Sequence, residues 1–407
     1  MSRTRLPLLS VLPVTVVTAV VAVPFVLGDH PLRWESGSML PRLVTGEQAP
    51  ATGGGGADGT AAGPADPDTP PAKVAKEWKE GMPQWGVQLY WEDNADHDLA
   101  YVQKQARLHA DYLVSLHANS VSVSFPFVTG GRASTEISAS AKTPPPDRMA
   151  AVLKIFHDAG LRTTVRPLLD EASLDVPAGD WRGNIEPSDR DAWFRSYEKF
   201  VGPYLKTAES EKTASFVIGT ELNSMEGDER WDAVVERAET IYSGDVAYDA
   251  NWDAYVQGPV SMPVSHLGVD AYFPVKVDDD ASVQTLVDGW QEWLDKKATG
   301  PLPKITIAEA GIGAMDGAYK APGDFYTKRD VNPEVQANWY TAVCQVVQER
   351  QMSGVYWWSI YFDDDPNTKP DDKVASRLDF AGRPLTEKAI KSCFSSDYAG
   401  PGTDTAS

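Results

Sequence analysis

From Trp85 onward, short apolar runs rich in β-branched residues alternate with longer stretches of helical length, and this alternation constrains the fold more than any other feature of the chain. Eight runs have the length and composition of strands, at residues 85–90, 120–125, 162–168, 216–222, 245–249, 266–272, 304–310 and 354–360. Helices are predicted at residues 97–118, 147–159, 189–207, 230–242, 282–297, 334–351 and 386–393. Strands that alternate with helices in this way indicate a parallel sheet covered by helices.

Eight strands, nearly all followed by a helix, predict an α/β fold of the (β/α)8 TIM-barrel type. The segment between residues 249 and 266 leaves little room for a helix, so none is expected there. A doubly wound sheet is the alternative, but it calls for a glycine-rich phosphate turn after an early strand. No such fingerprint is found, and the barrel is the preferred fold.

The domain organisation follows from shifts in composition along the 407 residues. Arg3 and Arg5 precede an uncharged, largely apolar run at 6–28, so residues 1–30 are predicted to be a signal-anchor or a cleaved signal peptide. Residues 31–76 are rich in Gly, Ala and Pro and predict a flexible linker. The barrel is expected at 77–396 and a disordered tail at 397–407. The protein is therefore expected on the extracellular face of the cell membrane, or secreted.

Charge and cysteine content narrow the range of partners. The formal net charge of −21 argues against binding to nucleic acid, whose phosphates would be repelled. No Cys or His cluster has metal-ligand spacing, and no metal or cofactor is predicted. The two cysteines, Cys344 and Cys393, fall on predicted helices; outside the membrane they could form a disulfide, or they are two separate buried thiols. A monomer is expected.

Two of the predicted strands end in a glutamate, Glu221 in the fourth and Glu309 in the seventh. A buried carboxylate is costly unless it is paired, hydrogen-bonded or neutralised. TIM barrels place their active sites at the carboxyl ends of the strands, where both glutamates fall. Such a pair suggests a glycosidase, in which one carboxyl is the acid/base and the other the nucleophile. The alternative is that each glutamate begins a loop and meets solvent.

The chain also resembles a known family, glycoside hydrolase family 113, which belongs to the retaining clan A. The resemblance extends from about Trp85 to Phe394 and is carried by Arg166-Pro-Leu-Leu-Asp170, Trp181-Arg-Gly-Asn-Ile185, Trp193-Phe-Arg-Ser-Tyr197, Ile218-Gly-Thr-Glu221 and Tyr356-Trp-Trp-Ser359. It implies Glu221 as acid/base, Glu309 as nucleophile and a β-linked polysaccharide substrate, with β-mannan as the best guess. One position departs from most of the clan: Thr220 stands where an Asn usually contacts the sugar 2-hydroxyl, and its role here is unassigned.

Two further residues are expected to support the nucleophile. Tyr272, at the end of the sixth predicted strand, can donate a phenolic hydrogen bond to Glu309, as its clan counterpart does. Arg166, at the end of the third, supplies a positive charge, or else forms a structural ion pair with Asp170 or another acid at a strand end.

Aromatic residues near the strand ends are candidates for binding sugar rings, whose apolar faces stack on Trp. Trp358 is expected to form the floor of a subsite, with Trp357 pointing the other way by strand alternation. Further subsites are expected from Trp91, Trp181 and Trp252, and hydroxyl contacts from Thr220, Asn251 and Asp270. Core packing for each Trp, and loop capping for Asn251 and Asp270, are the alternatives.

Three functions are compatible with these residues. The first is a retaining glycosidase that cleaves a β-linked hexose polymer such as mannan. The second is the same chemistry on galactan, glucan or the organism's own surface glycan. The third is a catalytically inactive barrel that binds glycan at the cell surface.

Overall fold

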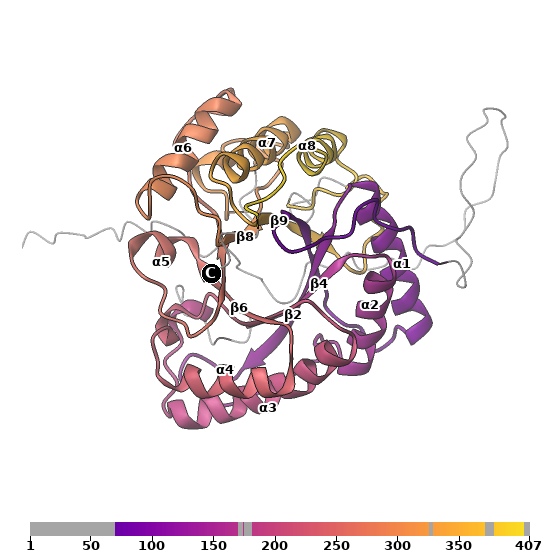
Figure 1. Ribbon diagram of the computed structural model, residues 1–407, viewed down its shortest axis with the longest axis vertical. Helices are drawn as coiled ribbons and strands as arrows, with labels where there is room; N and C mark the ends of the chain where they lie inside the picture. The colour runs from indigo at the N-terminus through magenta and orange to yellow at the C-terminus, as the bar shows by residue number, and fades with distance from the viewer. Residues whose placement is uncertain (1–69, 170–173, 175–180, 325–328, 371–377, 403–407) are drawn as a thin grey trace, which may run out of the picture.

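The fold is a closed parallel barrel. The computed structural model describes residues 70–169, 174, 181–324, 329–370 and 378–402 (Figure 1). The barrel strands are β1 (Gln84–Tyr90), β2 (Ser120–Thr129), β4 (Arg162–Leu169), β5 (Ser215–Thr220), β6 (Asp245–Asn251), β7 (His266–Asp270), β8 (Ile305–Ala310) and β9 (Gly354–Tyr361). Each pairs in parallel with the next, and β1 pairs with both β2 and β9, which closes the sheet.

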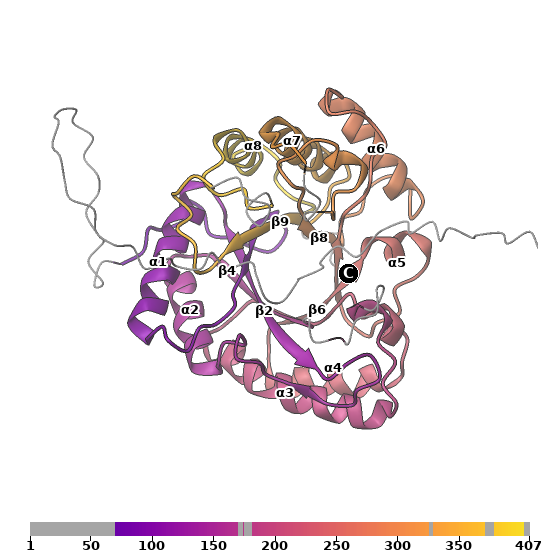
Figure 2. The same ribbon diagram turned by 180° about the vertical axis from the view of Figure 1, so that it is seen from behind.

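A ring of helices surrounds the barrel in both views (Figures 1 and 2). These are α1 (Leu99–Ser115), α2 (Pro146–Asp158), α3 (Arg190–Ser210), α4 (Arg230–Ile241), α5 (Trp252–Gln257), α6 (Val283–Asp295), α7 (Pro333–Glu349) and α8 (Pro384–Phe394). The described residues also form short 3-10 turns, η2 (Arg182–Asn184), η3 (Asn223–Met225) and η4 (Ala318–Lys320). The (β/α)8 barrel predicted from the sequence is confirmed.

Residue alternation along the strands explains why this barrel has a polar interior. In β2, Val121 and Val123 belong to the hydrophobic core, whereas Ser122 lines a cavity inside the barrel and Ser124 donates to Gln88 of β1. Successive side chains of a strand point to opposite faces, so one face of β2 packs on the helices and the other is polar. The same alternation in β4 points Arg166 toward the barrel axis, where the site forms.

Two elements differ from the sequence prediction. Helix α5 occupies the segment in which no helix was expected, because six residues suffice to place it between β6 and β7. Strand β3 (Ile137–Ser138) pairs antiparallel with Val128 and Thr129 at the end of β2, which itself runs four residues past the predicted end.

The ordered domain is longer at both ends than the predicted 77–396. Val74 donates a backbone hydrogen bond to Ala159 and packs against the core. At the other end, the hydroxyl of Tyr398 donates to the Met352 carbonyl at 2.7 Å, and Gly402 donates to Gly81. The expected disordered tail is therefore wrong for residues 397–402, because these contacts fix them beneath the barrel.

The predictions of a membrane segment and a linker concern the N-terminal part of the chain. The membrane segment at 1–30 and the linker up to residue 69 lie outside the described residues. Within the described ranges, no helix is long and apolar enough to cross a bilayer.

For the two cysteines, the structure has the first of the two alternatives that the sequence left open. Cys344 of α7 and Cys393 of α8 are bonded, across 49 positions of sequence. The bridge joins two neighbouring helices on the outside of the barrel, away from the strand ends that carry the glutamates.

Candidate active site

The two glutamates lie at the carboxyl end of the barrel, as predicted. Glu221 directly follows β5, the fourth barrel strand, and Glu309 is the second-last residue of β8, the seventh. Both side chains are fully buried, with 0% of each exposed. Two buried carboxyls of this kind need partners, and those partners define the site.

Glu221 occupies a strained backbone position. Its φ is 52°, in the left-handed region that costs a non-glycine residue on the order of 1–3 kcal/mol. The amide of Glu221 donates to the Asp249 carbonyl at 2.8 Å, and the amide of Leu222 donates to the Tyr248 hydroxyl at 3.0 Å. These bonds hold the turn that aims the Glu221 carboxyl into the barrel end.

Each oxygen of Glu221 accepts one hydrogen bond. Asn251 Nδ2 donates to Oε1 at 2.7 Å, while the Asn251 side-chain oxygen caps α5 by accepting from the Asp253 amide. Arg182 Nη1 donates to Oε2 at 2.8 Å. Burial raises the pKa of Glu221 to about 7 although Arg182 lowers it, and the negative charge of Glu309 adds to the rise. A carboxyl with such a pKa can hold a proton near neutral pH.

Glu309 has a different environment. The hydroxyl of Tyr272 donates to its Oε2 at 2.7 Å, the contact expected from the sequence. The Nη1 of Arg166 lies 2.6 Å from its Oε1. The two glutamates are therefore held in contrasting surroundings.

Arg166 forms ion pairs with three carboxylates at once. Besides Glu309 it contacts Asp249, Nε to Oδ2 at 2.6 Å, and Asp270, Nη2 to Oδ2 at 2.8 Å. The sequence left two roles open for Arg166, and the residue combines them. It is the cation beside Glu309, and it also pairs with acids at the strand ends. Asp170, the other partner considered, lies outside the described residues.

Among the described residues of the site, carboxyls outnumber guanidiniums. Four buried carboxyls meet here, from Glu221, Asp249, Asp270 and Glu309. Two buried arginines oppose them, Arg166 and Arg182. Burial raises the pKa of Asp249, and raises that of Asp270 well above its ordinary value. Burial thus disfavours ionisation of Asp249 and Asp270, while the guanidinium of Arg166 favours it.

A glycine makes room for this network. A Cβ at Gly268 of β7 would come within 2.1 Å of Asp249 Oδ1. Any larger residue at this position would displace Asp249 from Arg166, which explains why β7 carries a glycine in its centre.

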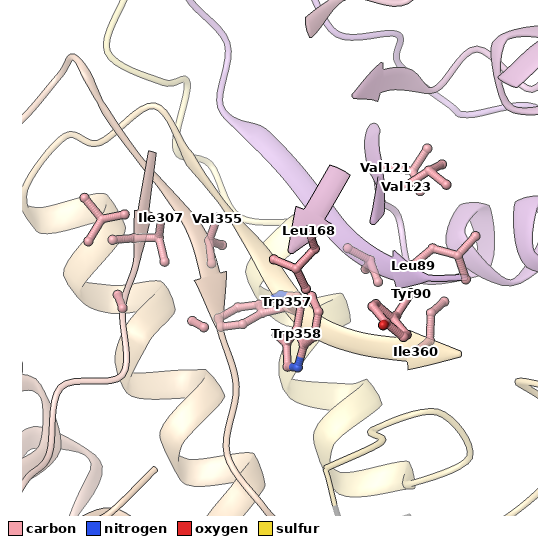
Figure 3. Close-up of a cluster of buried hydrophobic side chains, with 14 of the residues drawn as sticks. Leu89, Tyr90, Val121, Val123, Leu168, Ile307, Val355, Trp357, Trp358 and Ile360 are labelled. Atoms are coloured by element: carbon pink, nitrogen blue, oxygen red, sulfur yellow. The ribbon is translucent and has the colours of Figure 1, made fainter. Parts of the chain in front are cut away.

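The structure supports Trp358 and Trp181 as aromatic candidates near the carboxyls. Trp358 of β9 is 0% exposed, as buried as the two carboxyls, and its ring lies 6.0 Å from the Arg166 guanidinium. Figure 3 shows Trp357 and Trp358 on this strand, and Trp357 stacks on Tyr340 of α7. Trp181 is half-buried beside Gly183 and precedes Arg182, the partner of Glu221.

Two other tryptophans must be corrected. Trp91 is 1% exposed and stacks on Phe362, and Trp252 is 3% exposed and packs edge-on against Phe273 and Trp293. Both rings belong to the core: Trp91, just after β1, packs on Phe362, and Trp252, the first residue of α5, packs between Phe273 and Trp293. Neither offers a ring face to a sugar.

The hydroxyl-binding candidates all lie in the site. Asn251 contacts Glu221, and Asp270 contacts Arg166. Asp270 Oδ1 and Thr220 Oγ1 are buried and have no hydrogen-bond partner within the described part of the chain. Asp270 shares Arg166 with Glu309, and Thr220 directly precedes Glu221 in the chain.

Two residues of the site were not predicted. Asp249 belongs to a predicted strand, but nothing in its sequence context marks it as a partner of Arg166. Arg182 falls in a motif that supported the family resemblance, yet a lone arginine in a loop carries no pattern that points to Glu221. Only the folded arrangement brings residues 182 and 221 together.

The site can perform acid/base chemistry together with nucleophilic attack. Glu221 has a raised pKa, and Glu309 lies beside the guanidinium of Arg166 and the hydroxyl of Tyr272. Among the described residues, no group of three His, Cys, Asp or Glu side chains is arranged to hold a metal ion.

Comparisons with known proteins identify the family of the chain. The sequence profile of Glycoside Hydrolase Family 113 matches residues 90–376. No match was found among curated proteins.

Three solved structures are similar to the chain over nearly their full length. A GH113 β-1,4-mannanase in a complex has a TM-score of 0.60 at 20% identity, over 77% of this chain and 99% of that one. A second GH113 β-1,4-mannanase has a TM-score of 0.62 at 19% identity, over 78% and 100%. The GH113 β-mannanase AaManA from Alicyclobacillus acidocaldarius, in complex with ManMIm, has a TM-score of 0.59 at 20% identity, over 77% and 97%.

At these identities the structural similarity concerns the fold. The profile match extends over more than half of the sequence and includes both strands that carry the glutamates. This chain therefore belongs to glycoside hydrolase family 113 and is a glycoside hydrolase.

Proposed function

We propose that this glycoside hydrolase is a retaining β-mannanase in which Glu221 is the general acid/base and Glu309 the nucleophile. The observation that carries the proposal is the contrast between the two buried carboxyls. Burial raises the pKa of Glu221 to about 7, whereas Glu309 faces Arg166 and the Tyr272 hydroxyl. Unequal environments of this kind separate an acid from a nucleophile.

The reaction takes two steps. Glu309 attacks the anomeric carbon while Glu221 gives its proton to the departing glycosidic oxygen, so that a glycosyl ester forms and the glycosidic bond breaks. Glu221, now a carboxylate, then takes a proton from water as the water oxygen attacks the same carbon. The ester bond breaks, Glu309 is released as a carboxylate, and the anomeric configuration is retained.

Mannan is the proposed substrate because the three similar structures are β-mannanases of the same family. Buried Thr220 and Asp270 oxygens without partners support a sugar-binding role for both, and Trp358 and Trp181 are proposed to contact sugar rings.

Hydrolysis by the purified full-length protein tests the function. The wild type, Glu221→Gln and Glu309→Gln are incubated with β-mannan, β-galactan and β-glucan, with Glu209→Gln as a control for the same change on α3 outside the site. We expect mannan to be cleaved by the wild type and the control, and by neither active-site variant. Cleavage of galactan or glucan instead would keep the mechanism and replace the substrate. Binding without cleavage of any glycan, equal in all variants, would favour the inactive glycan-binding barrel.

The two roles are separated by azide, which can replace either carboxylate in a truncated variant. With an activated aryl β-mannoside, Glu221→Ala should give β-mannosyl azide, because azide replaces the water that attacks the ester. Glu309→Ala should give α-mannosyl azide, because azide replaces the nucleophile itself. The opposite products would exchange the two assignments.

We also propose that the enzyme works outside the cytoplasm, held by residues 1–30 as a signal-anchor or released after cleavage. The Cys344–Cys393 disulfide supports this location, since such bonds persist in oxidising compartments. Fractionation of the native host separates the outcomes: the protein in the membrane fraction indicates an anchor, in the medium secretion, and in the cytosol would contradict the proposal.

A further inference from the structure

Glu221 must change its charge twice in each proposed catalytic cycle. It is neutral before it donates its proton and negative afterwards, in a position where 0% of its side chain is exposed. An isolated carboxylate in such surroundings costs several kcal/mol relative to water. The site therefore needs a positive group that meets this charge when it forms.

Arg166 is not that group in direct contact. Its three nitrogens face Asp249, Asp270 and Glu309, at 2.6 to 2.8 Å. Arg182 is the guanidinium that touches Glu221, Nη1 to Oε2 at 2.8 Å. Resting on the proposed roles of the two glutamates, we propose that Arg182 is a positioning residue for the reaction, which holds the Glu221 carboxyl in place and carries the countercharge to the carboxylate left by proton transfer.

The placement of Arg182 suits this role. Its Nε donates to the carbonyl of Leu169, the last residue of β4, at 3.0 Å, and its side chain is fully buried. The planar fork of the guanidinium thus links the end of the neighbouring strand to the Glu221 carboxyl. Asn251 holds the other carboxyl oxygen at 2.7 Å, so both oxygens of Glu221 are fixed. Asn251 is neutral, and only Arg182 brings charge.

Other ionisable groups also face Glu221, and they affect its ionisation together with Arg182. They are Arg166 on β4, Tyr248 on β6, Asp270 on β7, Tyr272 after β7 and Glu309 on β8. The effect of Glu309 is to disfavour ionisation of Glu221, and that of Arg166 is to favour it. The contact with Arg182 favours it most among the neighbouring charges.

The test is the pH dependence of Arg182→Met, read on two substrates. Without the countercharge, Glu221 should keep its proton to higher pH, and the alkaline limb of kcat/KM on β-mannan should move up by about one pH unit or more. Proton donation would also leave an unmatched anion. Mannan hydrolysis should therefore fall at least about tenfold more than hydrolysis of 2,4-dinitrophenyl β-mannobioside, whose leaving group needs no proton.

Two variants show whether the charge is responsible. Arg182→Lys keeps the charge without the fork, and should return the alkaline limb toward the wild-type position. Arg162→Met removes another buried arginine, at the opposite end of β4, where it pairs with Asp245 at 3.1 Å. This control should lower stability and leave the limb in place.

A merely structural role of Arg182 predicts that Arg182→Met leaves the alkaline limb of the kcat/KM profile in place and loses equal activity on the two substrates. Either result would overturn the inference. An equal shift in Arg162→Met would overturn it too. The proposed function fails separately: if Glu221→Gln hydrolyses mannan like the wild type, Glu221 is not the acid/base. If Glu221→Gln is inactive on mannan and the Arg182→Met limb does not move, only the inference about Arg182 is refuted.

Discussion

The hydrogen bond from Tyr272 to Glu309 can be removed by deleting a single atom. In Tyr272→Phe the phenolic oxygen, 2.7 Å from Glu309 Oε2, is lost and the ring remains. Both side chains are buried, so water does not readily replace the donor. Glu309 would keep Arg166 at 2.6 Å, which it shares with Asp249 and Asp270. The variant therefore isolates one contact of the proposed nucleophile.

The expected loss of activity in Tyr272→Phe follows from the charge of the acceptor, Glu309. A hydrogen bond to a charged group contributes about 1.5–3 kcal/mol. The bond fixes the carboxylate for attack and stabilises it again when the glycosyl ester breaks. If the whole contribution is realised at the transition state, kcat/KM falls about 10- to 150-fold, since each 1.36 kcal/mol is a factor of about ten.

The assay is steady-state kinetics on β-mannan with urea unfolding measured in parallel, and Tyr242→Phe is the matched control. The Tyr242 hydroxyl is equally buried and donates at 2.6 Å to the neutral Thr213 carbonyl, at the other end of the barrel. The control should lose about 1 kcal/mol of unfolding free energy with unchanged kcat/KM. If Tyr272→Phe stays within twofold of the wild type, or if Tyr242→Phe loses as much activity, the proposed contribution of this bond is refuted.

Two further predictions concern stability. Burial raises the pKa of Asp379 to about 8, so this carboxyl stabilises the fold at pH below its unfolded value near 4 and loses that effect as pH rises toward 8. Relative to Asp379→Asn, which stays neutral, the wild type should lose on the order of 3 kcal/mol of unfolding free energy between pH 5 and pH 8 in urea titrations; parallel curves would contradict this. Replacing Cys344 and Cys393 by Ser opens a loop of 49 positions and should cost about 2–4 kcal/mol in unfolding free energy. The double variant should hydrolyse mannan at 25 °C as the wild type does, and a reductant should destabilise only the wild type. If the variant loses activity without losing stability, a purely structural role of the disulfide is refuted.

Strands and helices with strong local patterns could be predicted from the sequence to within a few residues. The run 304–310 predicted β8 (Ile305–Ala310), and 230–242 predicted α4 (Arg230–Ile241). Helix α5 was missed because six residues give too short a period to recognise, and β3 because a two-residue strand depends on its partner. The ordered residues after 396 were missed because their contacts are with distant parts of the chain, as in the bond from Tyr398 to Met352.

The residues of the candidate site also divide into those that the sequence could predict and those that it could not. Glu221, Glu309, Tyr272 and Arg166 could be predicted because each stands at or near a strand end, and the barrel brings strand ends together. Arg182 could not, since its loop must first fold across β4 to reach Glu221.

The rings of Trp91 and Trp252 could not be placed either. Their positions near strand ends were correct, but neither the short segment after β1 nor the six-residue helix α5 has a sequence period from which side-chain direction could be predicted.

The central claim is that Glu309 forms a covalent bond to the sugar while Glu221 handles the proton, and trapping the intermediate tests it most directly. The full-length enzyme is incubated with a 2-deoxy-2-fluoro β-mannobiosyl fluoride, which forms the ester faster than water can break it. Digestion and peptide mass spectrometry then locate the label. The account predicts one 2-deoxy-2-fluoro-mannobiosyl group attached at Glu309, with the label absent in Glu309→Gln and in enzyme unfolded beforehand. A label on Glu221, Asp270 or any other residue would contradict it.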